Sequence, residues 1–234
     1  MSNIFIKNAT IYSMDANIGN LQNGNILIKD DLIVSIDHKT EKDFDKDPVL
    51  QRFKFQLESS NIKTLHTLKP DFSWAAENVD KILNKYFSGK FIILFPFSSP
   101  QNSEKKWPYY NELIKIIKSK HKNFEIIIAP GQADIEDAQK INATIITNIK
   151  SPLNIMELSG LIKKSSFVIS NDTGPAHIAA HLGREGVALF GPHTSPQKVS
   201  IETESFKSIS STDLTKLSAE NVYSEIKKKL ELIN

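Results

Sequence analysis

The chain contains no cysteine among its 234 residues, which excludes disulfide bonds, thiolate metal sites and cysteine nucleophiles. Long hydrophobic runs are also missing, because no apolar stretch approaches the roughly 20 residues that a helix needs to span a bilayer. The N-terminus lacks the charged start and the small-residue cleavage site of a signal peptide. Together these absences favour a cytoplasmic protein.

A marked excess of one charge is absent as well. The 29 lysines and arginines nearly balance the 27 aspartates and glutamates, and the formal net charge is +2. Because the basic residues are spread among acidic ones, the sequence predicts no nucleic-acid partner. With 40% apolar residues the chain can bury a core. Its length allows one domain of about 150 residues and a smaller piece.

Residues 90–234 show a regular alternation of strand and helix patterns. Short apolar runs rich in Ile, Val and Phe alternate with segments whose apolar residues recur at helical spacing. The expected strands are 91–95, 124–129, 144–147, 167–170, 187–190 and 206–209, and the expected helices are 108–120, 134–141, 155–164, 175–182 and 219–233. This order predicts an α/β fold with a Rossmann-like, doubly wound parallel sheet.

The first 89 residues have a different pattern. Residues 1–37 carry short apolar runs separated by Asn, Gly and Asp, which predicts a small β-rich extension. Its expected strands are 4–6, 9–12, 26–28 and 32–36. Residues 38–89 are expected to form a linker, charged and irregular at 38–47, with an interdomain-type helix at 48–60.

Residues 170–196 have the order strand, turn, helix, strand and turn that is typical of a ligand site. The first turn, Asn171-Asp172-Thr173-Gly174, precedes a helix, and Gly174 allows a ligand to approach the backbone closely. Uncapped N–H groups at the start of that helix favour an anion. A second turn at Gly191-Pro192 lies at the same edge of the sheet, where open α/β sheets bind ligands. The alternative is that Asp172 only caps the helix and the glycines only form turns.

The motif DTGPAHIAAHLG, followed by VALFGP, resembles the signature of the family-9 glycosyltransferases, the heptosyltransferases that build the inner core of bacterial lipopolysaccharide. The resemblance extends upstream to FPFSS at 95–99 and KKWP at 105–108, and it covers the chain from about residue 47 onward. It implies the GT-B architecture, in which two Rossmann-like domains face each other across a cleft. The chain resembles the C-terminal domain, which binds the nucleotide-sugar donor.

The resemblance implies that several residues of this chain bind a nucleotide sugar. Asp172, Thr173 and Gly174 would contact the sugar and the pyrophosphate. Ser98 and Ser99 would donate hydroxyl hydrogen bonds to the diphosphate, although an ordinary serine turn explains them equally well.

Four further residues complete the donor site that the resemblance implies. Lys105 would neutralise the donor phosphates as a point charge, and Glu136 would contact the ribose hydroxyls. Leu153 would line the adenine pocket, and His177 would either touch the donor or hold the turn in place. The alternatives are that Lys105 belongs to a solvated lysine pair and that Glu136 is an acid on an exposed helix face.

No metal and no cofactor are expected. His177 and His181 have the i, i+4 spacing of a metal-binding helix, but no glutamate lies between them as in zinc proteases and no third ligand is evident. His193 stands where family members more often carry threonine directly after Gly-Pro. The lysine run 227–229 fits either a solvated helix face or peripheral contact with the anionic inner membrane.

The function implied by the resemblance is inverting transfer of heptose from ADP-heptose to a sugar hydroxyl of a lipopolysaccharide precursor. In the family the catalytic base lies in the acceptor domain, and the first 90 residues are too short and of the wrong pattern to supply it. Whether the chain is an enzyme therefore stays open. It is a transferase, or the donor-binding half of one completed by a separate acceptor-domain chain or a homodimer, or a non-catalytic nucleotide-sugar-binding module or truncated remnant.

The N-terminal run NATIYSMDANIGNLQNGNILIKDDLIVSID resembles the opening strands of the amidohydrolase superfamily, which form part of a small β-sandwich beside a metal-binding barrel. No His-x-His follows it and the barrel pattern is absent, so hydrolase activity is not expected. We interpret residues 1–37 as a short β extension.

Overall fold

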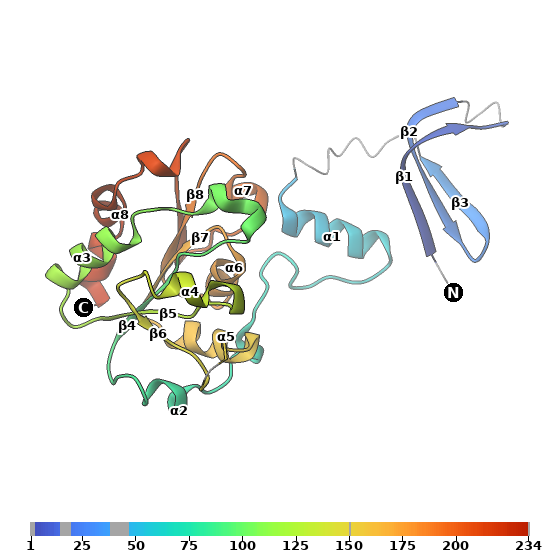
Figure 1. The fold of residues 1–234 in the computed structure, drawn as a ribbon. Coiled ribbons are helices and arrows are strands. Elements are labelled where there is room, and N and C mark those ends of the chain that lie inside the picture. The colour runs from blue at the N-terminus through green and yellow to red at the C-terminus, as the bar shows by residue number, and fades with distance from the viewer. Residues whose placement is uncertain (1–2, 15–19, 38–46, 150, 234) are drawn as a thin grey trace. The chain divides into compact units, whose positions relative to one another are not determined.

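A computed structural model describes residues 3–14, 20–37, 47–149 and 151–233 (Figure 1). The chain divides into two compact units, Met1–Asp47 and Pro48–Asn234. The charged stretch 38–46, which belongs to the expected linker, lies outside the described residues. Within the described part, no helix is long and apolar enough to cross a membrane.

The first unit is a three-stranded antiparallel sheet in the order β1-β2-β3, formed by β1 (Asn3–Tyr12), β2 (Asn20–Lys29) and β3 (Leu32–Asp37). The predicted β-rich extension is confirmed, but its strands are longer than expected. The reason is that the asparagines do not end the strands. Asn8 has a φ of 53° and lies where the register between β1 and β2 shifts, so it forms an irregularity inside one strand.

The second unit contains a six-stranded parallel sheet in the order β6-β5-β4-β7-β8-β9. Its strands are β4 (Phe91–Phe95), β5 (Glu125–Ile128), β6 (Thr144–Ile145), β7 (Phe167–Asn171), β8 (Gly186–Phe190) and β9 (Phe206–Ser210). The predicted doubly wound parallel sheet is confirmed. Because the chain runs outward from β4 in one direction and from β7 in the other, the strand order reverses between these two neighbours, which is where such sheets bind ligands.

The helix bounds agree most closely with those expected from the sequence where a local signal, such as a capping box, marks the end of the helix. The helices are α1 (Val49–Ser59), α2 (Asp80–Leu83), α3 (Tyr110–Lys120), α4 (Ile135–Ala138), α5 (Ile155–Lys164), α6 (Gly174–His181), α7 (Pro196–Val199) and α8 (Ala219–Ile233). The start of α5 is fixed by a capping box between Asn154 and Glu157. Helix α4 is shorter than the expected 134–141: a 3-10 turn at Gln132–Asp134 precedes it, and the chain leaves the helix after Ala138.

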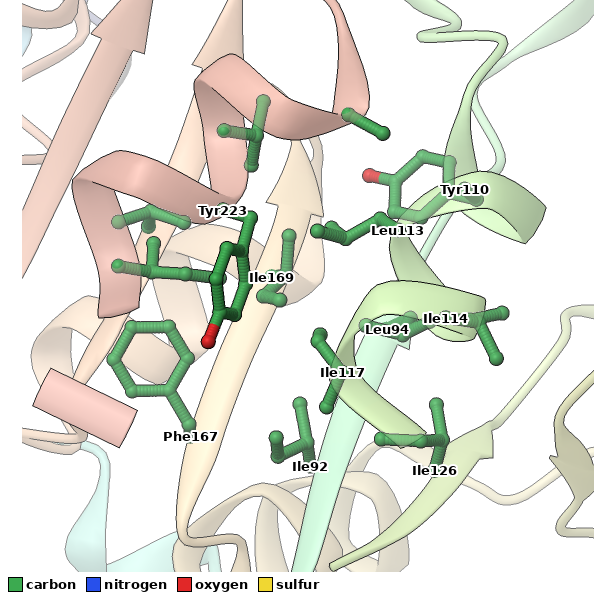
Figure 2. Packing of buried hydrophobic residues seen from close by; sticks show 14 of the residues in the cluster. Ile92, Leu94, Tyr110, Leu113, Ile114, Ile117, Ile126, Phe167, Ile169 and Tyr223 are labelled. Atoms are coloured by element: carbon green, nitrogen blue, oxygen red, sulfur yellow. The ribbon is translucent and has the colours of Figure 1, made fainter. Parts of the chain in front are cut away.

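Helices pack on both faces of the parallel sheet. Residues that alternate along β4, β5 and β7 point to opposite faces, and one set packs against α3 and α8, as Figure 2 shows. The other set packs against α2, α5 and α6. In α8 the apolar residues at helical spacing face the core, since Val222, Ile226 and Leu230 are buried and Ile233 is partly buried. The sheet therefore forms the rigid centre of this unit, and its carboxyl edge carries the loops.

Helix α5 lies directly against the backbone that precedes α2. The N–H of Glu77 donates to the carbonyl oxygen of Met156 at 3.2 Å. Gly160, one turn further along α5, is buried, and a Cβ atom added there would overlap the carbonyl oxygen of Glu77. The absence of a side chain at Gly160 thus permits this close packing.

Replacing Gly160 with alanine is expected to lower the free energy of unfolding by about 1–3 kcal/mol through overpacking. The loss should occur even though alanine favours a helix interior by ~1 kcal/mol over glycine. Urea unfolding checks this, with Ser159→Ala as the matched control, because Ser159 is also buried on α5 and loses only a hydroxyl bonded to Ile155. Wild-type stability of Gly160→Ala would show that the helix is not tightly packed there.

Candidate functional site

The loops that follow β4, β5 and β7 surround a cavity of about 430 Å³ at the carboxyl edge of the sheet. Its volume lies within the range of small-molecule sites. The wall is largely apolar, with a few polar groups. The lining residues are Phe95, Phe97, Ser98, Ser99, Ala129, Pro130, Gly131, Ala133, Asp134, Leu153, Leu158, Thr173 and Pro175.

The fully buried amide of Asn171, the last residue of β7, holds the neighbouring loops together. Its Nδ2 donates to the carbonyl oxygen of Pro96 at 2.8 Å. Its Oδ1 accepts from the backbone N–H of Trp107 at 3.3 Å and from the hydroxyl of Tyr110 at 3.1 Å. Asn171 thus fixes the end of β4, the start of α3 and the turn that carries Asp172 relative to one another.

Helix α6 begins at this turn without a side-chain cap. Thr173 is its N-cap residue, but the Thr173 hydroxyl points back toward the strand, 3.2 Å from the hydroxyl of Ser170. Among the described residues, no side chain caps the first turn. Pro175 has no N–H, and the N–H groups of Ala176 and His177 donate to the carbonyl oxygen of Thr173, so the N–H of Gly174 is the donor that the turn offers to a ligand. The alternative that Asp172 serves only as an N-cap is wrong. A Cβ atom at Gly174 would meet no atom of the described residues within 4 Å beyond its chain neighbours and its own helix, and the residue is exposed, so the backbone is accessible there.

The side chain of Asp172 lies instead in a cluster of basic groups. Lys105 donates from Nζ to Oδ2 at 2.8 Å, and Nε2 of His193 lies 3.1 Å from the same oxygen. Nε2 of His177 lies 3.8 Å from Oδ1, which is beyond hydrogen-bonding distance. These groups come from the loops after β4 and β8 and from α6, so one carboxylate connects three parts of the edge.

The charge of Asp172 is stabilised despite its burial. Burial alone raises the pKa of this carboxyl, but His177, Lys105 and His193 outweigh it, and the pKa lies well below the ordinary range. The carboxylate is therefore ionised at neutral pH and is paired with the ammonium of Lys105.

The remaining residues of the predicted donor site lie at different places. Ser98, Ser99 and Leu153 line the cavity. The hydroxyl of Ser98 donates to the backbone oxygen of Asn102 at 2.9 Å. Glu136 is exposed on α4 and is not among the lining residues.

Two residues near the cavity were not singled out as ligands from the sequence. Asp134, at the start of α4, lines the cavity and is half-buried, and burial raises the pKa of its carboxyl. The run Asp134, Glu136, Asp137 signalled a carboxylate in this turn, but not which one would face inward. His193 appeared only as a departure from the family pattern, yet it contacts Asp172.

The reversal of strand order, the cavity beside it and the uncapped helix start define a Rossmann-like α/β protein with a candidate ligand site at the carboxyl edge of its sheet. A family model described as glycosyltransferase family 9 (heptosyltransferase) matches residues 31–229. The chain belongs to this family.

Individual relatives agree with this assignment. The lipopolysaccharide core heptosyltransferase OpsX of Haemophilus influenzae is 32% identical over 128 residues, which are 53% of this chain and 35% of OpsX. Among solved structures, the E. coli heptosyltransferase WaaC with ADP has a TM-score of 0.58 at 19% identity, over 75% of this chain and 54% of WaaC. The E. coli ADP-heptose heptosyltransferase II has a TM-score of 0.54 at 18% identity, over 73% and 53%. This chain thus spans about half the length of these solved structures, and they show that the fold is shared.

The pairing of Asp172 predicts a pH dependence of stability. Since the folded-state pKa is depressed, the carboxylate stabilises the fold above its ordinary pKa of 3.8, and this contribution is lost as the pH falls toward the folded-state value. At pH 6, Asp172→Asn is expected to lower the free energy of unfolding by about 1–3 kcal/mol. The difference from wild type should shrink as the pH falls from 5 to 3.

Urea unfolding of both proteins at several pH values measures this difference. The control is Asp137→Asn, because Asp137 is paired with Lys140 on the exposed surface. That variant should change stability little at any pH. A constant offset between Asp172→Asn and wild type would show that the charge of Asp172 contributes nothing.

Proposed function

We propose that residues 48–234 bind ADP-heptose and act as the donor-binding half of a heptosyltransferase that modifies a lipopolysaccharide precursor. The observation that carries the proposal is the uncapped start of α6, which lies between the cavity and the Lys105–Asp172 pair. Membership of family 9 and the names of the relatives support heptose as the transferred sugar. The ADP in the WaaC structure supports the choice of nucleotide.

We assign the nucleoside to the cavity. Leu153, Leu158 and Ala129 offer apolar contact to an adenine ring. The carboxylate of Asp134 is suited to accept hydrogen bonds from the ribose hydroxyls, because it lines the cavity. Glu136 lies two residues further along the chain and is exposed, and it is a second candidate for the ribose.

We assign the diphosphate to the first turn of α6 and to Lys105. The positive end of the helix dipole and the backbone at Gly174 favour an anion. Ser98 and Ser99 line the cavity on the facing loop, where their hydroxyls donate to Asn102 and Gln101 and would turn to the diphosphate on binding. The heptose would then lie at Asp172 and Thr173, where the carboxylate accepts hydrogen bonds from its hydroxyls. His177, on the exposed side of Asp172, would contact the sugar or the phosphate.

The proposed reaction is an inverting displacement at the anomeric carbon of the heptose. The bond from that carbon to the diphosphate oxygen breaks, a bond to the acceptor hydroxyl oxygen forms, and the hydroxyl proton passes to a general base. Negative charge grows on the departing ADP, where Lys105, the N–H of Gly174 and the positive end of the α6 dipole stabilise it without a metal or a cofactor.

We propose that residues 48–234 bind the donor, and that the acceptor and its catalytic base lie elsewhere in the assembly, on a separate acceptor-domain chain or, in a homodimer, on a face of the second copy.

We place the reaction at the cytoplasmic face of the inner membrane. The lysine run on α8 is partly neutralised, since Lys229 pairs with Glu185 at 3.0 Å and Lys227 with Glu231 at 3.7 Å, which favours a solvated face over membrane contact.

Calorimetric titration of the purified chain with ADP and with UDP tests the donor assignment. We expect ADP to bind with a dissociation constant between the micromolar and low-millimolar range and more tightly than UDP. In Gly174→Ala, ADP affinity should fall about tenfold, equal to about 1.4 kcal/mol, because the added methyl group obstructs the approach to the helix start.

The unfolding midpoint of Gly174→Ala provides the control. It should equal that of wild type, because the added Cβ meets no protein atom. Failure of wild type to bind either nucleotide would contradict the proposed function, and tighter binding of UDP would contradict the choice of donor.

A further inference from the structure

The loop after β8 places a histidine on the carboxylate that the proposed function assigns to the sugar. Nε2 of His193 lies 3.1 Å from Oδ2 of Asp172, the oxygen that also accepts from Lys105 at 2.8 Å. Because an ionised carboxylate only accepts hydrogen bonds, Nε2 carries the proton and donates it. Nδ1 of His193 is buried and has no hydrogen-bond partner among the described residues, so Asp172 is the acceptor that fixes the ring's direction.

His193 is held more firmly than the other groups around Asp172. Its side chain is 10% exposed, compared with 22% for Lys105 and 32% for His177. The imidazole lies nearly parallel to the ring of Phe190, at an interplanar angle of 12° and a centroid distance of 6.3 Å. A Cβ atom on Gly191 would lie 3.3 Å from Nδ1 of His193, so the glycine leaves just enough room for the ring.

Lys105 has the opposite properties. It carries a compact charge on a flexible four-carbon stem, and its side chain is more exposed than that of His193. An anion that binds at the start of α6 competes with Asp172 for this ammonium group. Without another partner on Oδ2, the departure of Lys105 would leave a buried carboxylate with a weakened set of contacts, which is costly.

We propose that His193 is a positioning residue that keeps Asp172 in place and hydrogen-bonded while Lys105 turns from Asp172 to the diphosphate of the incoming ligand. The inference rests on the proposed function, because it assigns a diphosphate to Lys105. His193 acts through Asp172 and does not itself touch the ligand. His177 does not replace it, because His177 lies 3.8 Å from the other carboxylate oxygen.

A double-mutant cycle with ADP as the probe tests this role. His193→Phe keeps an aromatic ring against Phe190 but removes the donor to Asp172, so Lys105 stays with the carboxylate. We expect ADP affinity, measured by calorimetry, to fall about tenfold. His193→Gln should restore it to within about twofold of wild type, because the glutamine amide can donate from nearly the same position as Nε2.

The same substitution in the Asp172→Asn background separates this role from a general structural one. Without the charge of Asp172, Lys105 is free for the phosphates, so adding His193→Phe should leave the ADP affinity unchanged. An equal loss in both backgrounds would overturn the proposal, since His193 would then act on the ligand or on the loop without Asp172. Unchanged affinity of His193→Phe in the wild-type background would also overturn it.

A second measurement needs no ligand. In ¹³C NMR titration of the aspartate carboxyls, the pKa of Asp172 should rise in His193→Phe and return toward the wild-type value in His193→Gln. An unchanged pKa in His193→Phe would show that His193 does not hold the carboxylate. Absence of ADP binding by wild type would overturn the proposed function, whereas wild-type binding that His193→Phe leaves intact would overturn only the role of His193.

Discussion

The buried amide of Asn171 is the interaction on which the geometry of the edge depends. Parallel strands end at one edge of a sheet, but their loops are separate segments and need a common attachment. Asn171 provides it, because its amide bonds to Pro96 after β4 and to Trp107 and Tyr110 at the start of α3. A buried amide whose hydrogen bonds are satisfied holds its partners firmly, because leaving them unpaired in the interior is costly. The direction of the next residue, Asp172, is therefore determined by the same network.

The carboxyl edge has two chemically different halves. Loops after β4 and β5, together with the start of α5, form the largely apolar cavity. Loops after β4, β7 and β8 bring together charged groups at Asp172. Helix α6 starts between these halves, with Thr173 bordering the cavity and Asp172 in the charged cluster. An apolar half and a charged half side by side suit a ligand that is itself divided, with a flat base at one end and a phosphate-linked sugar at the other.

The sequence was sufficient for the elements whose signals are local. Strand β4 and helices α5 and α8 have the predicted bounds, because a fully apolar run, a capping box and an amphipathic pattern each act within a few residues. The sequence was not sufficient to identify which carboxylate at the start of α4 lines the cavity. At 3.6 residues per turn, positions two residues apart point to nearly opposite sides, and the packing of the turn decides that Asp134 lines the cavity and Glu136 does not. The contact between His193 and Asp172 joins residues 21 positions apart, and it depends on the path of a loop that no periodic pattern describes.

The ion pair between Lys105 and Asp172 also affects how the site would discriminate between a free phosphate ion and a larger ligand. A lysine beside an uncapped helix start would attract any small anion, including the inorganic phosphate that is abundant in cells. Here the lysine is already neutralised by a buried carboxylate at 2.8 Å, so a lone phosphate must pay to separate the pair and gains little in return. A larger ligand can offset that cost with contacts elsewhere along the edge. In the proposed site, this internal neutralisation would favour molecules that carry more than a phosphate.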